Sequence, residues 1–177
     1  MERHFIHELE ALKSNLIKMG SLAEQAIAES IRALLEGRKQ IAQRVIEQDG
    51  EINAMEIEID NQIVDLLALQ QPVAKDLRFI VAASKITTDL ERIGDHAVNI
   101  AESAVQYVDL APVKPLVDIP KMVQITQRML RDAIDGFIYN NPVPCREVLP
   151  CDDVIDDLNK QVVGELVTIM SQNPESI

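Results

Sequence analysis

The stretch FIVAASKITTDLERIGDHAVNIAESAVQY, residues 79–107, decides the fold class of this chain. Its apolar residues recur at alternating steps of four and three, and they are Phe79, Ala83, Ile86, Leu90, Ile93, Ala97, Ile100, Ala104 and Tyr107. This spacing places them along one stripe of an α-helix. The stretch therefore predicts a long amphipathic helix that buries one face against its neighbours.

Two runs with similar spacing precede it, over residues 5–34 and 41–69. Gly37 follows the first run, and glycine is typical just beyond a helix end. The second run stops before Pro72, because a proline disfavours the helical conformation of the residue before it. Long helices joined by short connections are antiparallel neighbours, so residues 3–108 are expected to form an up-down-up three-helix bundle.

Residues 109–120, DLAPVKPLVDIP, contain three prolines and are expected to be a stiff linker between two domains. Beyond the linker, the apolar spacing predicts a helix from about Lys121 to Tyr139. The NNPVP segment is expected to break this helix, and a further helix is expected to start near Asp152. Pro150 either kinks that last helix or sits in its first turn.

An internal repeat relates the two halves of the chain. A shift of 103 positions superposes them without gaps, and it matches Met19 with Met122, Asp49 with Asp152, Ile52 with Ile155, Asn53 with Asp156 and Leu66 with Ile169. Residues 121–177 are thus predicted to be a second copy of the bundle that lacks its third helix. The predicted fold is all-α, with tandem up-down-up three-helix bundles. Because the missing helix would leave an apolar face uncovered, we expect a chain truncated at its C-terminus, and a second chain as the cover is the alternative.

The amino-acid composition excludes several classes of function. The 177 residues carry 29 Asp and Glu against 17 Lys and Arg, for a formal net charge of −12. Nucleic-acid binding needs a basic stripe that displaces counterions from phosphates, so no nucleic-acid partner is expected. No apolar run approaches the roughly 18 residues of a membrane span, and the charged start does not resemble a signal peptide. The protein is expected to be cytoplasmic, without direct membrane insertion, and its Cys145 and Cys151 are expected to be reduced thiols.

The densest group of candidate ligands lies in DLERIGDHAVNIAE, residues 89–102. Glu91 and Asp95 are four residues apart and so share one helix face. Asp49 and Asn53 share a face of the preceding helix, and the turn between the two helices brings both pairs to the same height. Three carboxylates and an amide then converge without a compensating basic cluster, which favours a bound cation. All-oxygen ligands suit Mg²⁺, Mn²⁺, Ca²⁺ or iron rather than structural zinc.

Other interpretations stay open at this point. The acids can form a solvated face that Arg92 or Arg78 neutralises, and His96 can be a surface histidine rather than a nitrogen ligand. Lys75 and Arg78 can pair with acids on the second helix or present charge to a partner, and pairing is the preferred expectation. The sequence lacks the Glu-x-x-His motif of di-iron bundles, a P-loop and a nucleophile with a plausible base.

Residues 71–102, QPVAKDLRFIVAASKITTDLERIGDHAVNIAE, and residues 49–60, DGEINAMEIEID, resemble the PhoU family of bacterial regulators of phosphate uptake and signalling. The E/D-x-x-x-D element, here Glu91 to Asp95, and the tandem three-helix repeat are hallmarks of that family. The resemblance implies a cytoplasmic protein, homodimeric in many members, that is not an enzyme. It also implies restraint of the phosphate-starvation response, exerted by linking the ATPase subunit of the phosphate ABC transporter to the sensor histidine kinase PhoR.

Some members of the PhoU family bind iron or other metals through these acidic motifs. By resemblance, Glu91 and Asp95 match the motif of the third helix, and Asp49 matches the first acid of the second-helix motif. Asn53 stands where the family more often has Asp, and the second copy keeps two acids without those of a third helix. The predicted metal ligands are therefore Glu91, Asp95, Asp49, Asn53, Asp152 and Asp156. The candidate ions are Fe, Mn, Mg and Zn, and no organic cofactor is expected.

Two other functions compete with the regulator, which is the preferred prediction. A carboxylate-bridged di-metal enzyme on a helical bundle would use Asp49, Glu91 and Asp95 around two metals. A purely structural bundle would use its acids for solubility alone.

Overall fold

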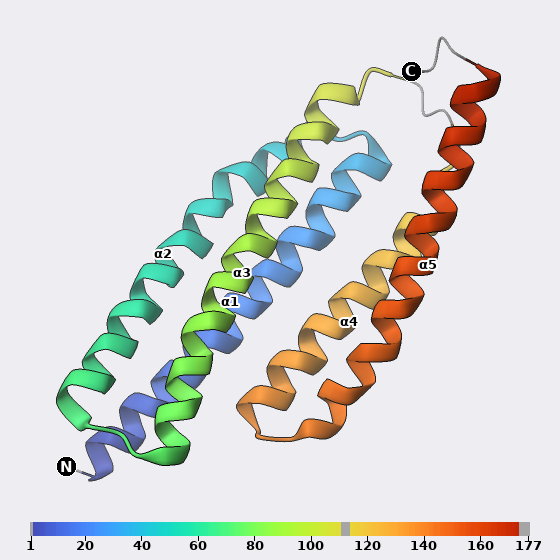
Figure 1. Ribbon diagram of the computed structural model, residues 1–177. Helices are drawn as coiled ribbons and strands as arrows, with labels where there is room; N and C mark the ends of the chain where they lie inside the picture. The colour runs from blue at the N-terminus through green and yellow to red at the C-terminus, as the bar shows by residue number, and fades with distance from the viewer. Residues whose placement is uncertain (1, 111–113, 174–177) are drawn as a thin grey trace.

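The computed structural model describes residues 2–110 and 114–173, and in these ranges it contains helices and no strand. The helices are α1 (Glu2–Glu36), α2 (Lys39–Gln70), α3 (Ala74–Tyr107), α4 (Asp118–Ile138) and α5 (Pro142–Gln172) (Figure 1). None of these helices is long and apolar enough to cross a membrane. The predicted all-α class is confirmed.

The first three helices form the predicted up-down-up bundle, in which every pair of helices is in contact (Figure 1). Its core is built from the apolar stripes that the sequence shows. The largest fully buried apolar side chains are Leu12, Leu16, Met19, Ile59, Leu66, Ile80 and Leu90. At roughly 1.5–3 kcal/mol for each buried side chain of this kind, burial of the stripes is the main force that holds the bundle together.

The connections of the first bundle are short because each helix ends at a residue that reverses the chain. Gly37 follows α1 with a φ of +63°, a left-handed conformation that glycine adopts without steric cost. Gln71 caps α2 in the same left-handed region, with a φ of 47°. Pro72 follows directly, as the predicted end of this helix requires.

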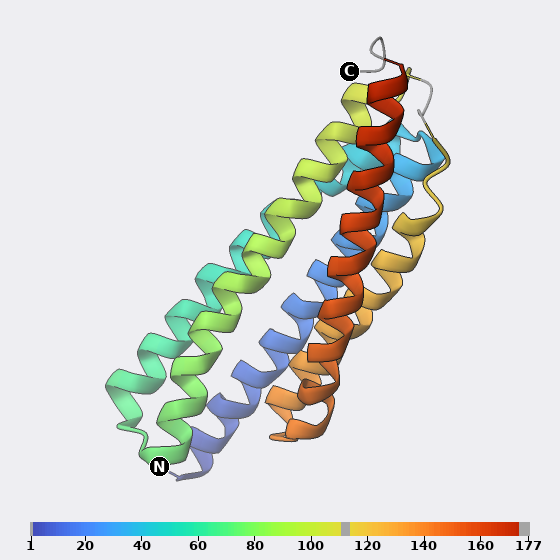
Figure 2. The ribbon, with the colours of Figure 1, turned by 45° about the vertical axis from the view of Figure 1, so that its right-hand side comes forward.

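The second pair of helices joins the first bundle through α4, which packs along α1 (Figures 1 and 2). The rings of Phe79 and Phe137 stack across this junction, with centroids 4.6 Å apart and an interplanar angle of 7°. Arg131 of α4 also forms an ion pair with Glu24 of α1. Among the helices of the described chain, α5 packs only against α4, and its Glu165 also pairs with Lys114 of the linker.

The start of α5 corrects the sequence prediction. The helix begins at Pro142 rather than near Asp152, and Pro150 lies inside it. The NNPVP segment does end the preceding helix, as predicted, because α4 stops at Ile138. Its prolines, however, fall in the first turn of α5, where no backbone N–H is needed for the helix ladder. The side chain of Asn141 caps this turn by accepting a hydrogen bond from the N–H of Val143.

The start of α4 also differs from the prediction. The helix begins at Asp118, so that Pro120, assigned to the linker, belongs to the first turn of α4. This position is again one where proline is tolerated. Cys145 and Cys151 are both free thiols, as expected.

Candidate acidic site between α2 and α3

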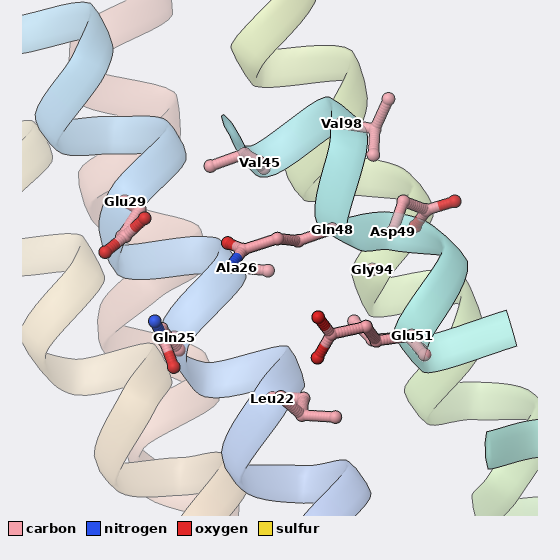
Figure 3. A pocket seen from close by; sticks show the side chains of 11 residues that line it. Leu22, Gln25, Ala26, Glu29, Val45, Gln48, Asp49, Glu51, Gly94 and Val98 are labelled. Atoms are coloured by element: carbon pink, nitrogen blue, oxygen red, sulfur yellow. The ribbon is translucent and has the colours of Figure 1, made fainter. Parts of the chain in front are cut away.

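The acidic residues singled out in the sequence lie on two helices that are direct neighbours. Asp49 and Asn53 come from α2, and Glu91 and Asp95 come from α3. Gly94 lies opposite Asp49, and a Cβ atom built on this glycine would be 3.5 Å from Asp49 Oδ1 and 3.0 Å from Ile52 Cδ1. Figure 3 shows Asp49 beside Gly94. The missing side chain at Gly94 therefore lets the α2 carboxylate reach the backbone of α3.

Asp49 and Asn53 form a hydrogen-bonded pair with spare acceptor capacity. The Nδ2 atom of Asn53 donates to Asp49 Oδ2 over 2.9 Å. The other two oxygens, Asp49 Oδ1 and Asn53 Oδ1, are buried and have no hydrogen-bond partner in the described structure. Buried acceptors of this kind normally receive a donor, an ordered water or a cation. Two of them side by side make this the least satisfied polar position in the bundle interior.

Electrostatics connect this pair to Glu91. Partial burial raises the pKa of Glu91 above its ordinary value, and the nearby charges of Asp95, Glu56 and Asp49 raise the pKa further. Arg92 lowers this pKa, but its guanidinium pairs with Asp89 at 3.5 Å, not with the cluster. The negative charge around Glu91 is therefore only weakly compensated.

A Glu91→Gln variant is expected to be more stable than the wild type at neutral pH in the absence of metal. A raised pKa means that the folded protein binds the Glu91 proton more tightly than the unfolded chain does. The free energy of unfolding from this group therefore falls as pH rises from about 4.5 through the folded pKa. Urea unfolding with a chelator, over roughly pH 4 to pH 8, measures this effect. The free energy of unfolding of the variant should increase relative to that of the wild type as pH rises. Glu102→Gln, an exposed change on the same helix, is the control, and equal pH profiles for Glu91→Gln and the wild type would contradict the expectation.

A small cavity of about 100 Å³ adjoins Asp49 at the junction of α1, α2 and α3. Figure 3 shows Gln48 and Glu51 of α2 reaching toward Gln25 and Glu29 of α1. The cavity is polar on this side and has room for ordered water. Sequence reasoning did not find it, although Gln48, a polar residue on an otherwise apolar stripe, was a signal.

The predicted ligands do not all come together. Asp152 and Asp156 are exposed on α5, which in the described chain makes no helix contact with α2 or α3, so they lie apart from the α2–α3 cluster. His96 is exposed as well. Over residues 2–110 and 114–173, no group of three or more His, Cys, Asp or Glu side chains is arranged to hold a metal ion. The acids of α2 and α3 thus influence one another electrostatically, but their side chains do not form a closed coordination shell.

Comparison with known proteins extends over both halves of the chain. A family model described as the PhoU domain matches residues 16–104 and 119–177. A phosphate-specific transport system accessory protein PhoU homolog from Aquifex aeolicus is 38% identical over 170 residues, which cover 96% of this chain and 77% of that protein. The phosphate-specific transport system accessory protein PhoU of Escherichia coli K12 is 32% identical over 173 residues, covering 98% of this chain and 72% of that protein. The crystal structure of PhoU from Pseudomonas aeruginosa superposes with a TM-score of 0.91 at 36% identity, covering 97% of this chain and 82% of that one.

Proposed function

The chain belongs to the PhoU family, and from this premise we propose that it is a negative regulator of the phosphate-starvation response. It acts in the cytoplasm by coupling a phosphate ABC transporter, through the ATPase subunit, to a PhoR-type sensor kinase. The observation that carries the proposal is the family match over both halves of the chain. Relatives that are similar over nearly the whole chain are named accessory proteins of the phosphate-specific transport system.

The proposed output is a protein contact. The net charge of −12 favours partners with basic surfaces, since complementary charge speeds encounter and selects the partner. A homodimer belongs to the same proposal, and symmetric two-fold dimers are the commonest oligomers of soluble proteins.

The proposal includes a metal ion, of iron, manganese, magnesium or zinc, on Asp49, Asn53, Glu91 and Asp95. Two features of the site support it. The buried oxygens of Asp49 and Asn53 lack partners, and the negative charge that raises the pKa of Glu91 is the kind that a cation relieves. Carboxylate and amide oxygens suit hard cations. When bound, the ion would supply positive charge that ties α2 to α3. Asp152 and Asp156 are left out, because no second helix faces them in the described chain.

A strain that lacks the gene is expected to express phosphate-starvation genes even when phosphate is plentiful. The physical reason is that the kinase then receives no restraining contact from the transporter. A reporter fused to a starvation-induced promoter measures this, and supplying the gene on a plasmid should restore repression, with the empty plasmid as control. Normal repression in the deletion strain would overturn the proposed function.

A further inference from the structure

A cleft of about 880 Å³ lies where the first bundle meets the turn between α4 and α5. The first turns of α3 form one side, and the end of α4 and the start of α5 form the other. In Figure 1 both the start of α3 and the α4–α5 turn lie at the lower end of the molecule. The cleft is therefore separate from the acidic site between α2 and α3. Its size lies in the range of pockets that hold small organic ligands, roughly 300–1,000 Å³.

Positive side chains line this cleft in an otherwise acidic protein. Lys75 and Arg78 are three residues apart on α3, so they are neighbours on one helix face. Both are exposed, and neither forms a hydrogen bond or ion pair with the described residues. The expectation that they pair with acids on the second helix is therefore wrong. The first turn of α3 has no side-chain cap, and Asp76 within it offsets part of the positive charge at this helix end.

The other charges of the cleft leave this excess in place. Lys13 forms an ion pair with Glu10 at 2.7 Å, and its Nζ lies 5.7 Å from the centroid of the Phe79 ring. Asp76 is the one carboxylate among the residues that line the cleft. Even when Glu10 is counted, three cations face two carboxylates.

An apolar wall adjoins the cations. Phe79 and Phe137 both line the cleft, and their stacked rings join the two bundles at this point. Both rings are half-buried, so part of each ring remains accessible. A ligand that matches the cleft therefore needs an anionic group for Lys75 and Arg78 and a flat apolar group for the phenylalanine wall.

We propose that this cleft binds a phosphate-bearing organic anion of nucleotide size. Its phosphate groups lie on Lys75 and Arg78, and its ring system lies against Phe79 and Phe137. Two adjacent cations match an anion with more than one negative charge, and the guanidinium fork matches phosphate oxygens. The inference stands apart from the proposed regulatory function, because it concerns a different surface and is tested by direct binding.

The test is titration calorimetry of the purified chain with ATP in the presence of a chelator, so that no metal bridges the nucleotide to the acidic site. ATP is expected to bind the wild type, and the Lys75→Glu/Arg78→Glu variant is expected to bind it at least tenfold more weakly. That factor corresponds to about 1.4 kcal/mol, close to the lower end of the range for one charge-assisted hydrogen bond. The control is Arg44→Glu/Lys85→Glu, which changes net charge equally at two exposed positions that do not line the cleft and should keep wild-type affinity. Circular dichroism verifies that both variants fold.

Two further titrants decide which part of the ligand is recognised. Tripolyphosphate, which carries phosphates without a ring, is expected to bind more weakly than ATP, and inorganic phosphate more weakly still. Equal affinity for tripolyphosphate and ATP would overturn the role of the phenylalanine wall. Failure of the wild type to bind ATP at millimolar concentration, or unchanged affinity in the Lys75→Glu/Arg78→Glu variant, would overturn the site; an acidic segment of a protein partner would then be the occupant to examine.

Discussion

An Ile59→Ala variant is expected to lose about 2–5 kcal/mol of unfolding free energy, the range measured for large-to-small changes in well-packed cores. Ile59 is 0% exposed and lies among buried side chains from all three helices of the first bundle, including Leu16 of α1 and Ile80 of α3. The substitution removes three carbon atoms and leaves a cavity that long, mutually braced helices cannot easily close. A domain of this size is stable by only about 5–15 kcal/mol, so the loss is a large share of the total.

Urea unfolding followed by circular dichroism measures this loss. Val64→Ala is the matched control, because Val64 lies on the same helix and is 62% exposed. Its effect should stay within about 0.5 kcal/mol of zero. Similar losses for the two variants would mean that the buried stripe of α2 is not what holds the bundle together.

From the proposed metal site, the wild type is expected to retain a metal ion through purification, and a Glu91→Ala/Asp95→Ala variant is expected to lose it. The double change removes both α3 carboxylates, which leaves Asp49 and Asn53 as donors from one helix only. Elemental analysis of protein prepared without chelator or nickel affinity resin measures the metal content. Asp152→Ala/Asp156→Ala serves as the control, since these exposed acids on α5 lie outside the proposed site and should leave the metal content unchanged.

Equal metal in the wild type and in the Glu91→Ala/Asp95→Ala variant would place the metal elsewhere. No metal in either protein would reduce the acidic motif to a charged docking surface, while the regulatory proposal would still stand on its own test. The two experiments therefore separate the metal site from the regulatory function.

The helices of the first bundle could be predicted from the sequence because the residues at the regularly spaced apolar positions are the ones that the bundle buries. Leu12, Leu90 and Ala97 are all on predicted stripes and are all buried. At the ends of the helices the stripes predict burial that the structure does not show, since Leu69 is 74% exposed and Tyr107 is 51% exposed. Periodicity identifies the face of a helix, but it does not identify where the neighbouring helix ends, and these residues extend past the core.

For the acidic site, the sequence predicts which residues of α2 and α3 lie at the same height along the bundle, but not how their side chains are arranged. Counting residues from the turn placed Asp49 and Glu91 near one another, and the charge of Asp49 does act on Glu91 in the structure. Which oxygens remain without partners depends on side-chain torsions that spacing does not encode. The cleft around Lys75 and Arg78 depends on how α4 packs on α1, a long-range contact with no local signature in the sequence.

Because α4 is the only helix of the described chain that α5 packs against, the two ends of the chain are expected to open unequally. The central turns of α2 and α3 are each packed against two other helices, so their backbone amides are expected to exchange with solvent through openings close to global unfolding. α5 packs against one helix and is tied to the linker by the ion pair between Lys114 and Glu165, so fewer contacts must separate before its amides exchange. The amides of α5 are therefore expected to exchange faster than those of the first bundle, through openings that leave α1, α2 and α3 folded.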